Sequence, residues 1–230
     1  MDAKPLPAMR RPSTARQSLL LTGFEPFGGE SVNVSWRVAQ ALAGERVDGV
    51  DVQAVCLPTA FGEALHALDT VLRRTRPSHV LCLGQAAGRA ELSIERVAIN
   101  LDDARIPDNQ GAQPIDQPVV AGAPAAYFSR WPLKHMVQAA RSAGVPAAVS
   151  LSAGSFVCNH VFFGLMHRIR RSRCVGGFMH LPLLPEQAER FPGWPTLPLQ
   201  QQIDGTRLML QAGVAHAGQA DLAVTEGQVA

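Results

Sequence analysis

The sequence has few cysteines, little charge and no long hydrophobic run. Its 230 residues contain 4 cysteines, no two of which form a CxxC pair, and this favours free thiols over a disulfide framework. No apolar run approaches the roughly 18 residues that a membrane-spanning helix needs. Residues 1–17 also lack the apolar core of a signal peptide. These absences predict a cytoplasmic protein without a membrane partner.

Charge and size narrow the class of protein further. Lys and Arg number 21 against 19 Asp and Glu, and the basic residues are scattered apart from short clusters, so no nucleic-acid partner is expected. With 47% hydrophobic residues, the chain fits one large domain better than two small ones. We expect a loose tail at 1–17, the folded domain at 18–216 and a frayed end at 217–230.

Short apolar runs alternate with segments of helical periodicity, which is typical of an α/β fold. Strands are predicted at 18–22, 50–56, 79–83, 96–99, 147–150 and 175–180. Apolar residues recur at helical spacing within 61–72, 133–140 and 199–214. Because helices separate the strands, we expect a mainly parallel sheet with functional residues at the carboxyl ends of its strands.

Three loops and one long segment are the places where such residues are expected. The loops at 23–32, 84–95 and 151–155 follow predicted strands. The segment 100–124 is rich in Pro, Gly, Asp, Asn and Gln and is unusually long for a loop in a compact domain. Loops of that length are often functional.

Cys158 is the first candidate for chemistry. The spacing of Cys158, Phe162, Leu165 and Ile169 predicts a helix that starts just before the cysteine, with Ser155 as its N-cap. In the first turn of a helix, unpaired N–H groups and the helix dipole favour a thiolate, so we expect a lowered pKa for Cys158. The same N–H groups can stabilise an oxyanion.

A nucleophilic cysteine needs a base and a group that orients the base. His180 closes the apolar run GGFMH at a predicted strand end, and Glu95 follows the 84–95 loop. We therefore interpret Cys158 as nucleophile, His180 as base and Glu95 as the carboxylate that holds the imidazole.

Simpler interpretations exist for each of these residue types. Most cysteines are merely buried, and this is how we interpret the other three, Cys56, Cys82 and Cys174. Glu95 by itself would be expected to form a surface ion pair with Arg96 or Arg89. His160 could pair with Cys158 at a metal, but no further ligands stand at a spacing typical of zinc, so no metal and no other cofactor is expected.

Four segments, in order along the chain, together resemble the pyroglutamyl-peptidase I family of cysteine peptidases. They are LLTGFEPFGGESVNVSW at 20–36, LGQAAGRAELSIERVAINLDDARIPDNQG at 83–111, SLSAGSFVCNHVFFGLMH at 150–167 and GGFMHLPLLPEQ at 176–187. One such segment would be weak evidence, whereas the ordered set covers nearly three quarters of the chain.

The resemblance implies a single-domain α/β/α sandwich and a catalytic triad of Glu95, Cys158 and His180, in agreement with the choice made from the residues. It also implies hydrolysis of the amide bond that follows an N-terminal pyroglutamyl residue of a peptide. Members of this family assemble as homotetramers, so the same assembly is expected here.

The family's pocket residues carry over to this sequence one by one. Phe24 and Phe27 of GFEPFGG and Gln85 of GQAAGR correspond to substrate-binding residues, and Arg105 of LDDARIPDN to an arginine near the oxyanion. Pyroglutamate is a compact uncharged lactam, which two aromatic faces and a few amide groups can bury with every polar atom paired.

The sequence departs from the family pattern at a few positions and leaves other functions open. Ala87 stands where glycine is more common, so a need for positive φ there would shift the loop that carries Gln85. Val34 stands where the proline of the pattern NPSW is more common. The chain could instead be a cysteine amidohydrolase for another small acyl group, or a non-catalytic binding domain in which Cys158 is simply buried.

Overall fold

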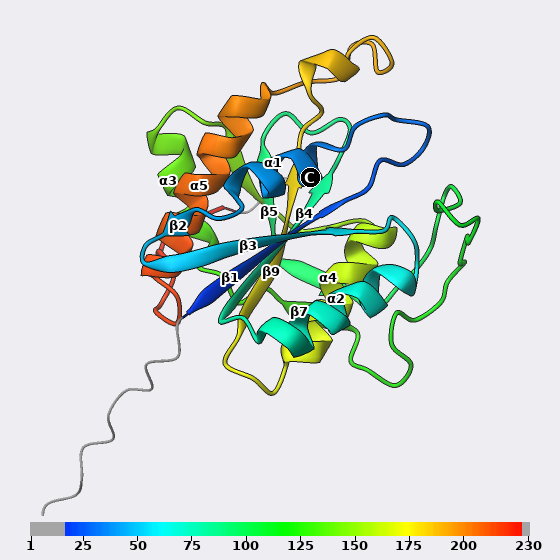
Figure 1. The fold of residues 1–230 in the computed structure, drawn as a ribbon, viewed down its shortest axis with the longest axis horizontal. Coiled ribbons are helices and arrows are strands. Elements are labelled where there is room, and N and C mark those ends of the chain that lie inside the picture. The colour runs from blue at the N-terminus through cyan, green and yellow to red at the C-terminus, as the bar shows by residue number, and fades with distance from the viewer. Residues whose placement is uncertain (1–16, 227–230) are drawn as a thin grey trace, which may run out of the picture.

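The computed structural model describes residues 17–226, in which a seven-stranded sheet runs between two layers of helices (Figure 1). The strand order is β2-β3-β1-β4-β9-β5-β8. Neighbouring strands are parallel except at β2–β3 and β5–β9. The strands are β1 (Ser18–Phe24), β2 (Arg46–Val47), β3 (Val50–Leu57), β4 (His79–Gln85), β5 (Leu92–Glu95), β8 (Ala147–Ser150) and β9 (Val175–Leu181). The prediction of a mainly parallel mixed sheet is confirmed.

Helices cover both faces of the sheet (Figure 1). On one face lie α1 (Val34–Leu42), α3 (Leu133–Ser142) and α5 (Leu199–Ala215), whose apolar residues share one buried cluster with the sheet. On the other lie α2 (Glu63–Thr75) and α4 (Val157–Ile169), with a second cluster. Each helix buries one apolar stripe because its hydrophobic residues recur at helical spacing. The α/β/α sandwich is thereby confirmed.

The strand β5 corrects the sequence prediction for the middle of the chain. Residues 84–95 were expected to form a loop and 96–99 a strand of the main sheet. In the structure β5 lies between β9 and β8, whereas β6 (Val97–Ile99) pairs with β7 (Ala126–Phe128) in a separate two-stranded sheet. Glu95, the last residue of β5, is fully buried.

The long segment predicted at 100–124 is irregular apart from an isolated bridge between Asp102 and Gln117. It packs against the start of α4, where Ser155 Oγ donates to Asp103 O at 2.8 Å. The sequence predicted Ser155 as the N-cap of α4, and this prediction is wrong. The N-cap position is taken by Phe156, which makes no side-chain capping bond. The hydroxyl bonds the neighbouring loop instead of the helix.

The chain beyond α5 is held more closely than the sequence indicated. Asp221 accepts hydrogen bonds from the backbone N–H groups of Lys134 and His135, at the start of α3, and Glu226 pairs with Arg141 at 2.8 Å. The first turn of α3 follows Pro132, which supplies no side-chain cap, so Asp221 takes that role. Residues 1–16 of the expected tail and 227–230 of the expected frayed end lie outside the described part of the chain.

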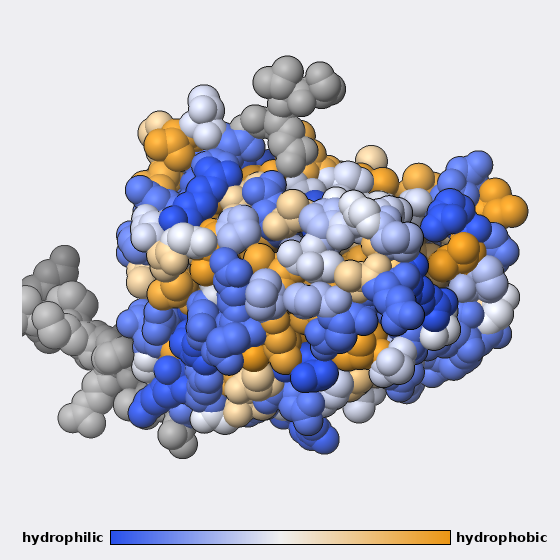
Figure 2. Space-filling view, turned by 90° about the horizontal axis from the view of Figure 1, so that it is seen from above, coloured by the Kyte–Doolittle hydropathy of each residue, from blue (hydrophilic) through white to orange (hydrophobic). Residues whose placement is uncertain are grey.

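The surface carries a few large hydrophobic side chains in separate segments. The most exposed of them are Ile115, Phe128, Leu151, Trp194 and Val224. On the face drawn in Figure 2, hydrophobic residues are interleaved with hydrophilic ones. Within residues 17–226, no helix is both long and apolar enough to cross a membrane.

Candidate active site

Glu95 and His180 meet across the antiparallel pair of β5 and β9. Ser93 stands directly opposite His180 in the register, so Glu95, two residues further on, is its diagonal neighbour on the same face. The Nδ1 atom of His180 lies 2.8 Å from Glu95 Oε1, and both side chains are almost completely buried. A carboxylate against Nδ1 makes that nitrogen the protonated one, which leaves Nε2 as an acceptor.

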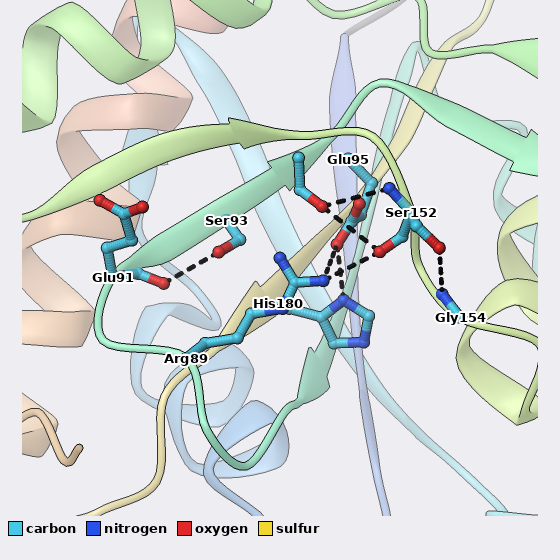
Figure 3. Close-up of polar contacts among 8 residues, drawn as sticks. Arg89, Glu91, Ser93, Glu95, Ser152, Gly154 and His180 are labelled. Atoms are coloured by element: carbon cyan, nitrogen blue, oxygen red, sulfur yellow. Dashed lines mark hydrogen bonds and ion pairs between the residues drawn. The ribbon is translucent and has the colours of Figure 1, made fainter. Parts of the chain in front are cut away.

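The Arg89 guanidinium contacts the same carboxylate of Glu95 (Figure 3). Its Nη2 lies 3.1 Å from Glu95 Oε1 and also donates to the backbone oxygen of Ser152 at 2.9 Å. The ion pair with arginine and the contact with histidine, which the sequence presented as alternatives for Glu95, both occur in the structure. The second carboxylate oxygen, Oε2, is buried without a hydrogen-bond partner among the described residues.

Cys158 is the second residue of α4, in the first turn, as the sequence predicted. It is half-buried, and its sulfur lies against β4: a Cβ atom placed on Gly84 would come within 2.9 Å of Sγ and 2.8 Å of Phe178 Cζ. In the described part of the chain, no hydrogen bond joins Cys158 to His180.

The environment of Cys158 overturns the expectation of a lowered pKa. Burial, followed by the nearby Glu95 carboxylate, raises the pKa of the thiol to about 12, while the Arg89 guanidinium acts in the opposite direction. Desolvation of the charged form and a nearby negative charge outweigh whatever the helix start contributes. With its pKa raised in this way, the sulfur carries its proton at neutral pH.

The close contact at Gly84 gives a testable prediction. Gly84→Ala would insert a methyl group where Sγ and the ring of Phe178 already stand, so the sulfur would have to move. Because misplacing a reacting atom by about 1 Å can cost about 100-fold in rate, a nucleophilic role for Cys158 predicts a fall in kcat of that order with little change in KM. Steady-state kinetics on a pyroglutamyl amide would measure it. A variant with wild-type kcat would show that the sulfur tolerates the shift.

A small cavity lies beside Cys158, with about 240 Å³ of empty volume. Three residues singled out in the sequence, Phe24, Phe27 and Gln85, line it together with Cys158. Its other lining residues are Asn33, Thr59, Phe156 and Val157. The small size of the cavity and its largely apolar lining suit a small group held against the sulfur.

Sequence reasoning missed four of the lining residues. Phe156 and Val157 directly precede Cys158 in FVCNH, so the predicted helix start could have pointed to them. Thr59 gave no such signal, and Asn33 could have been noticed only as the N-cap of the helix that follows it. Their polar groups are engaged within the protein: Asn33 Nδ2 and Thr59 Oγ1 both donate to the backbone oxygen of Glu25, at 3.0 and 2.9 Å.

Arg105 is not brought to the cavity. Its side chain is exposed, it does not line the cavity, and it makes no hydrogen bond or ion pair with the other described residues. The segment that carries it does touch the start of α4 through Asp103 and Ser155. A role for Arg105 at the oxyanion therefore stays a prediction.

His160 and Asn159 anchor the first turns of α4 to the segment that follows β6. His160 Nδ1 lies 2.7 Å from Asp102 Oδ2, and its Nε2 accepts from Gly62 N, so both ring nitrogens are occupied. The Asn159 amide bonds the backbone of Ile99. Within residues 17–226, there is no group of three or more His, Cys, Asp or Glu side chains that could hold a metal ion.

Ala87 leaves the loop of Gln85 unstrained. The residues other than glycine that have a positive φ are Asp48, Arg76 and Asp116 within the described chain, and Ala87 is not among them. The neighbouring Gly88 has a φ of 87° and supplies the left-handed turn. A glycine at position 87 is thus not needed for the backbone conformation found here.

Comparison with known proteins agrees with this arrangement. The sequence profile of the family described as pyroglutamyl peptidase matches residues 17–216. A pyrrolidone-carboxylate peptidase of Cupriavidus taiwanensis is 53% identical over 215 residues, which cover 92% of this chain and 99% of that protein. One from Yersinia pestis is 51% identical over 92% of this chain and 98% of its own length.

Solved structures agree as well. Pyroglutamyl peptidase I of Bacillus amyloliquefaciens superimposes with a TM-score of 0.86 at 41% identity, covering 89% of this chain and all of that one (100%). A mutant pyrrolidone carboxyl peptidase of Pyrococcus furiosus gives a TM-score of 0.84 at 36% identity, over 86% of this chain and 99% of its own. The chain therefore belongs to the pyroglutamyl peptidase family.

Proposed function

We propose that this chain is a cysteine peptidase that hydrolyses the amide bond after an N-terminal pyroglutamyl residue, with Cys158 as nucleophile, His180 as base and Glu95 as the group that orients the base. The observation that carries the proposal is the cavity in which Phe24 and Gln85 stand beside the Cys158 sulfur. Membership of the pyroglutamyl peptidase family supports the same reaction.

The cavity suits a neutral lactam ring better than a charged amino terminus. Its lining is largely aromatic and aliphatic, with no charged side chain among its residues. An aminopeptidase would need a carboxylate there to hold the substrate's ammonium group. Phe24, Phe27 and Phe156 offer apolar surface to the ring, and Gln85 offers an amide group to one of its polar atoms.

The raised pKa of Cys158 determines how the reaction begins. The sulfur attacks the pyroglutamyl carbonyl while its proton passes to His180 Nε2, the ring nitrogen that Glu95 leaves free. His180 then returns the proton to the leaving amine, and the acyl group remains as a thioester. Water, deprotonated by His180, hydrolyses the thioester and restores the thiol. Glu95 and Arg89 hold the imidazole in place throughout.

The negative oxygen formed in this attack needs hydrogen-bond donors. The first turn of α4 carries backbone N–H groups that the helix leaves unpaired, and Cys158 lies in that turn. We assign the oxyanion to these groups. Arg105 adds to them if its exposed segment folds over the site when substrate binds.

The thiol pKa predicts the pH dependence of alkylation. Because burial raises the pKa of Cys158 to about 12, the thiolate fraction should increase about tenfold with each pH unit from 7 to 10, with no plateau near neutrality. The rate of Cys158 alkylation by iodoacetamide, followed by peptide mass spectrometry, should follow that line. A plateau below pH 8 would instead mean that a thiolate is already formed in the resting enzyme.

The proposal is tested by release of a fluorogenic amine from its pyroglutamyl amide under reducing conditions, with alanyl and glutamyl amides run in parallel. We expect turnover of the pyroglutamyl amide alone. Preference for another acyl group would favour the alternative amidohydrolase. No turnover of any amide by the folded protein would favour a binding domain.

The remaining proposals concern the setting of the enzyme. We infer that residues 18–216 form the catalytic domain, which agrees with the matched range of 17–216, and that the protein acts in the cytoplasm. A homotetramer is proposed from the family resemblance. Sedimentation velocity at micromolar concentration would measure the assembly.

A further inference from the structure

Gln187 lies directly behind the cavity residue Gln85, although the sequence pattern gave it no role. It is the last residue of a short 3-10 helix (Pro185–Gln187), and only 3% of its surface is exposed. It is not among the residues that line the cavity. Its Nε2 lies 3.2 Å from Gln85 Oε1, across 102 residues of sequence.

The orientation of the Gln187 amide is fixed by its other two partners. Its Oε1 accepts from the backbone N–H of Leu184 at 2.9 Å, and its Nε2 donates to Glu30 Oε2 at 2.9 Å. A backbone N–H can only donate, and a carboxylate can only accept. The amide therefore cannot rotate by 180° without facing a donor with a donor and an acceptor with an acceptor. The atom that it presents to Gln85 is a donor.

This donor fixes the orientation of Gln85 in turn. Gln85 Oε1 accepts from Gln187 Nε2 and from the backbone N–H of Val34, both at 3.2 Å, so its two lone pairs are used. Gln85 Nε2 makes no hydrogen bond with any residue in the described part of the chain. Since Gln85 lines the cavity, it offers the cavity N–H donors and no acceptor.

We propose that Gln187 is a positioning residue for substrate specificity, because it holds the Gln85 amide with its NH₂ group toward the bound ring. The inference rests on the proposed function, in which the ring is a lactam. A lactam carbonyl oxygen is the acceptor that this NH₂ group requires. With the amide reversed, Gln85 would present an oxygen to that carbonyl, and two acceptors would face each other in a closed cavity.

The chain of fixed contacts extends from the cavity to the surface. Glu30, which receives the second N–H of Gln187, is paired through Oε1 with Arg190 Nε at 2.8 Å. Arg190 also donates to the backbone oxygen of Gly29, in the loop that carries Phe27. Arg190 thus holds the carboxylate of Glu30, and this carboxylate orients the Gln187 amide. The Gln187 amide in turn orients the Gln85 amide.

Two substitutions test this proposal. Gln187→Glu keeps an oxygen for the Leu184 N–H but replaces the NH₂ group that donates to both Gln85 and Glu30 with a carboxyl oxygen. A proton shared between this oxygen and the Glu30 carboxylate leaves an acceptor facing Gln85, so the Gln85 amide should reverse. Gln187→Met removes the donor and leaves Gln85 held by Val34 alone. The matched control is Gln202→Met, because Gln202 is also a buried glutamine whose Nε2 donates twice, to the backbone oxygens of Pro182 and Leu197, away from the cavity.

The measurements are KM and kcat for the pyroglutamyl amide and the inhibition constant of 2-pyrrolidone, the bare lactam. Neither KM nor the inhibition constant depends on the fraction of active protein. We expect Gln187→Glu to raise both about 10- to 100-fold and Gln187→Met about 3- to 10-fold, as for loss of one buried hydrogen bond, with kcat within about threefold. Gln187→Met adds no titratable group, so its pH profile should be unchanged. Gln202→Met should leave both constants unchanged.

Two results would overturn the proposal. Wild-type KM and inhibition constant in Gln187→Glu would show that Gln85 does not depend on Gln187, even though the pyroglutamyl amide is still turned over. Absence of any turnover by folded wild-type protein would overturn the proposed function, and this inference with it.

Discussion

Cys158→Ala is expected to abolish release of the amine from a pyroglutamyl amide, with kcat/KM lower by about 10⁴-fold or more. The reason is that the thioester cannot form without the sulfur, and no other described cysteine lines the cavity. The thiol makes no hydrogen bond with the other described residues, so its removal leaves no partner unpaired. The fold should therefore persist. Progress curves at high enzyme concentration, with circular dichroism of the variant, would measure both effects.

Cys174→Ala is the matched control for this experiment. Cys174 is also half-buried and also has a pKa raised to about 11 by burial, but it precedes the first residue of β9, whereas His180 lies near the last. Its replacement should leave turnover unchanged. If Cys158→Ala retained wild-type turnover while remaining folded, the sulfur of Cys158 could not be the nucleophile.

Glu95→Gln is expected to lower kcat about 10³- to 10⁴-fold, the second largest effect. An amide at position 95 can turn its NH₂ group toward His180 Nδ1, which stabilises the imidazole tautomer that carries its proton on Nε2. The nitrogen that must accept the thiol proton would then be blocked. The change also removes the ion pair with Arg89 at 3.1 Å. Single-turnover kinetics on the pyroglutamyl amide would measure the loss.

Glu45→Gln serves as the control for loss of an ion pair. Glu45 is paired with Arg207 at 2.8 Å, outside the candidate active site, and that pairing lowers the pKa of its carboxyl. We expect wild-type kcat from this variant. If Glu95→Gln lost no more activity than Glu45→Gln, the contact between Glu95 and His180 would have no part in the reaction.

Five of the six predicted strands appear in the main sheet, each with ends within two residues of the prediction. They were predictable because each is a continuous apolar run, often next to Gly or Pro, and each is buried in the sheet. The helix α4 was predictable as well, because its start and its apolar spacing follow from the residues around Cys158. Local sequence is sufficient where one element buries one regular face.

Two elements near the site escaped the sequence reasoning. The strand β5 is only four residues long and carries Ser93 and Glu95, so it has no apolar run; its place is decided by pairing with β9 and β8. The helix α1 directly follows the Gly- and Pro-rich loop in the sequence and was not predicted. Asn33 caps it by accepting from Ser35 N, and an Asn before an apolar helical pattern is a signal that could have revealed it.

By itself, the sequence determined the fold class, the family and the identity of Glu95, Cys158 and His180 as candidates, because these depend on local patterns and on motifs in order. Only the tertiary structure decided the direction of the Cys158 pKa, the pairing of Arg89 with Glu95 and the hold of Gln187 on Gln85. The contacts join side chains as far as 102 residues apart, and desolvation depends on everything that surrounds a group. Neither the long-range contacts of a side chain nor its desolvation can be read from its neighbours along the chain.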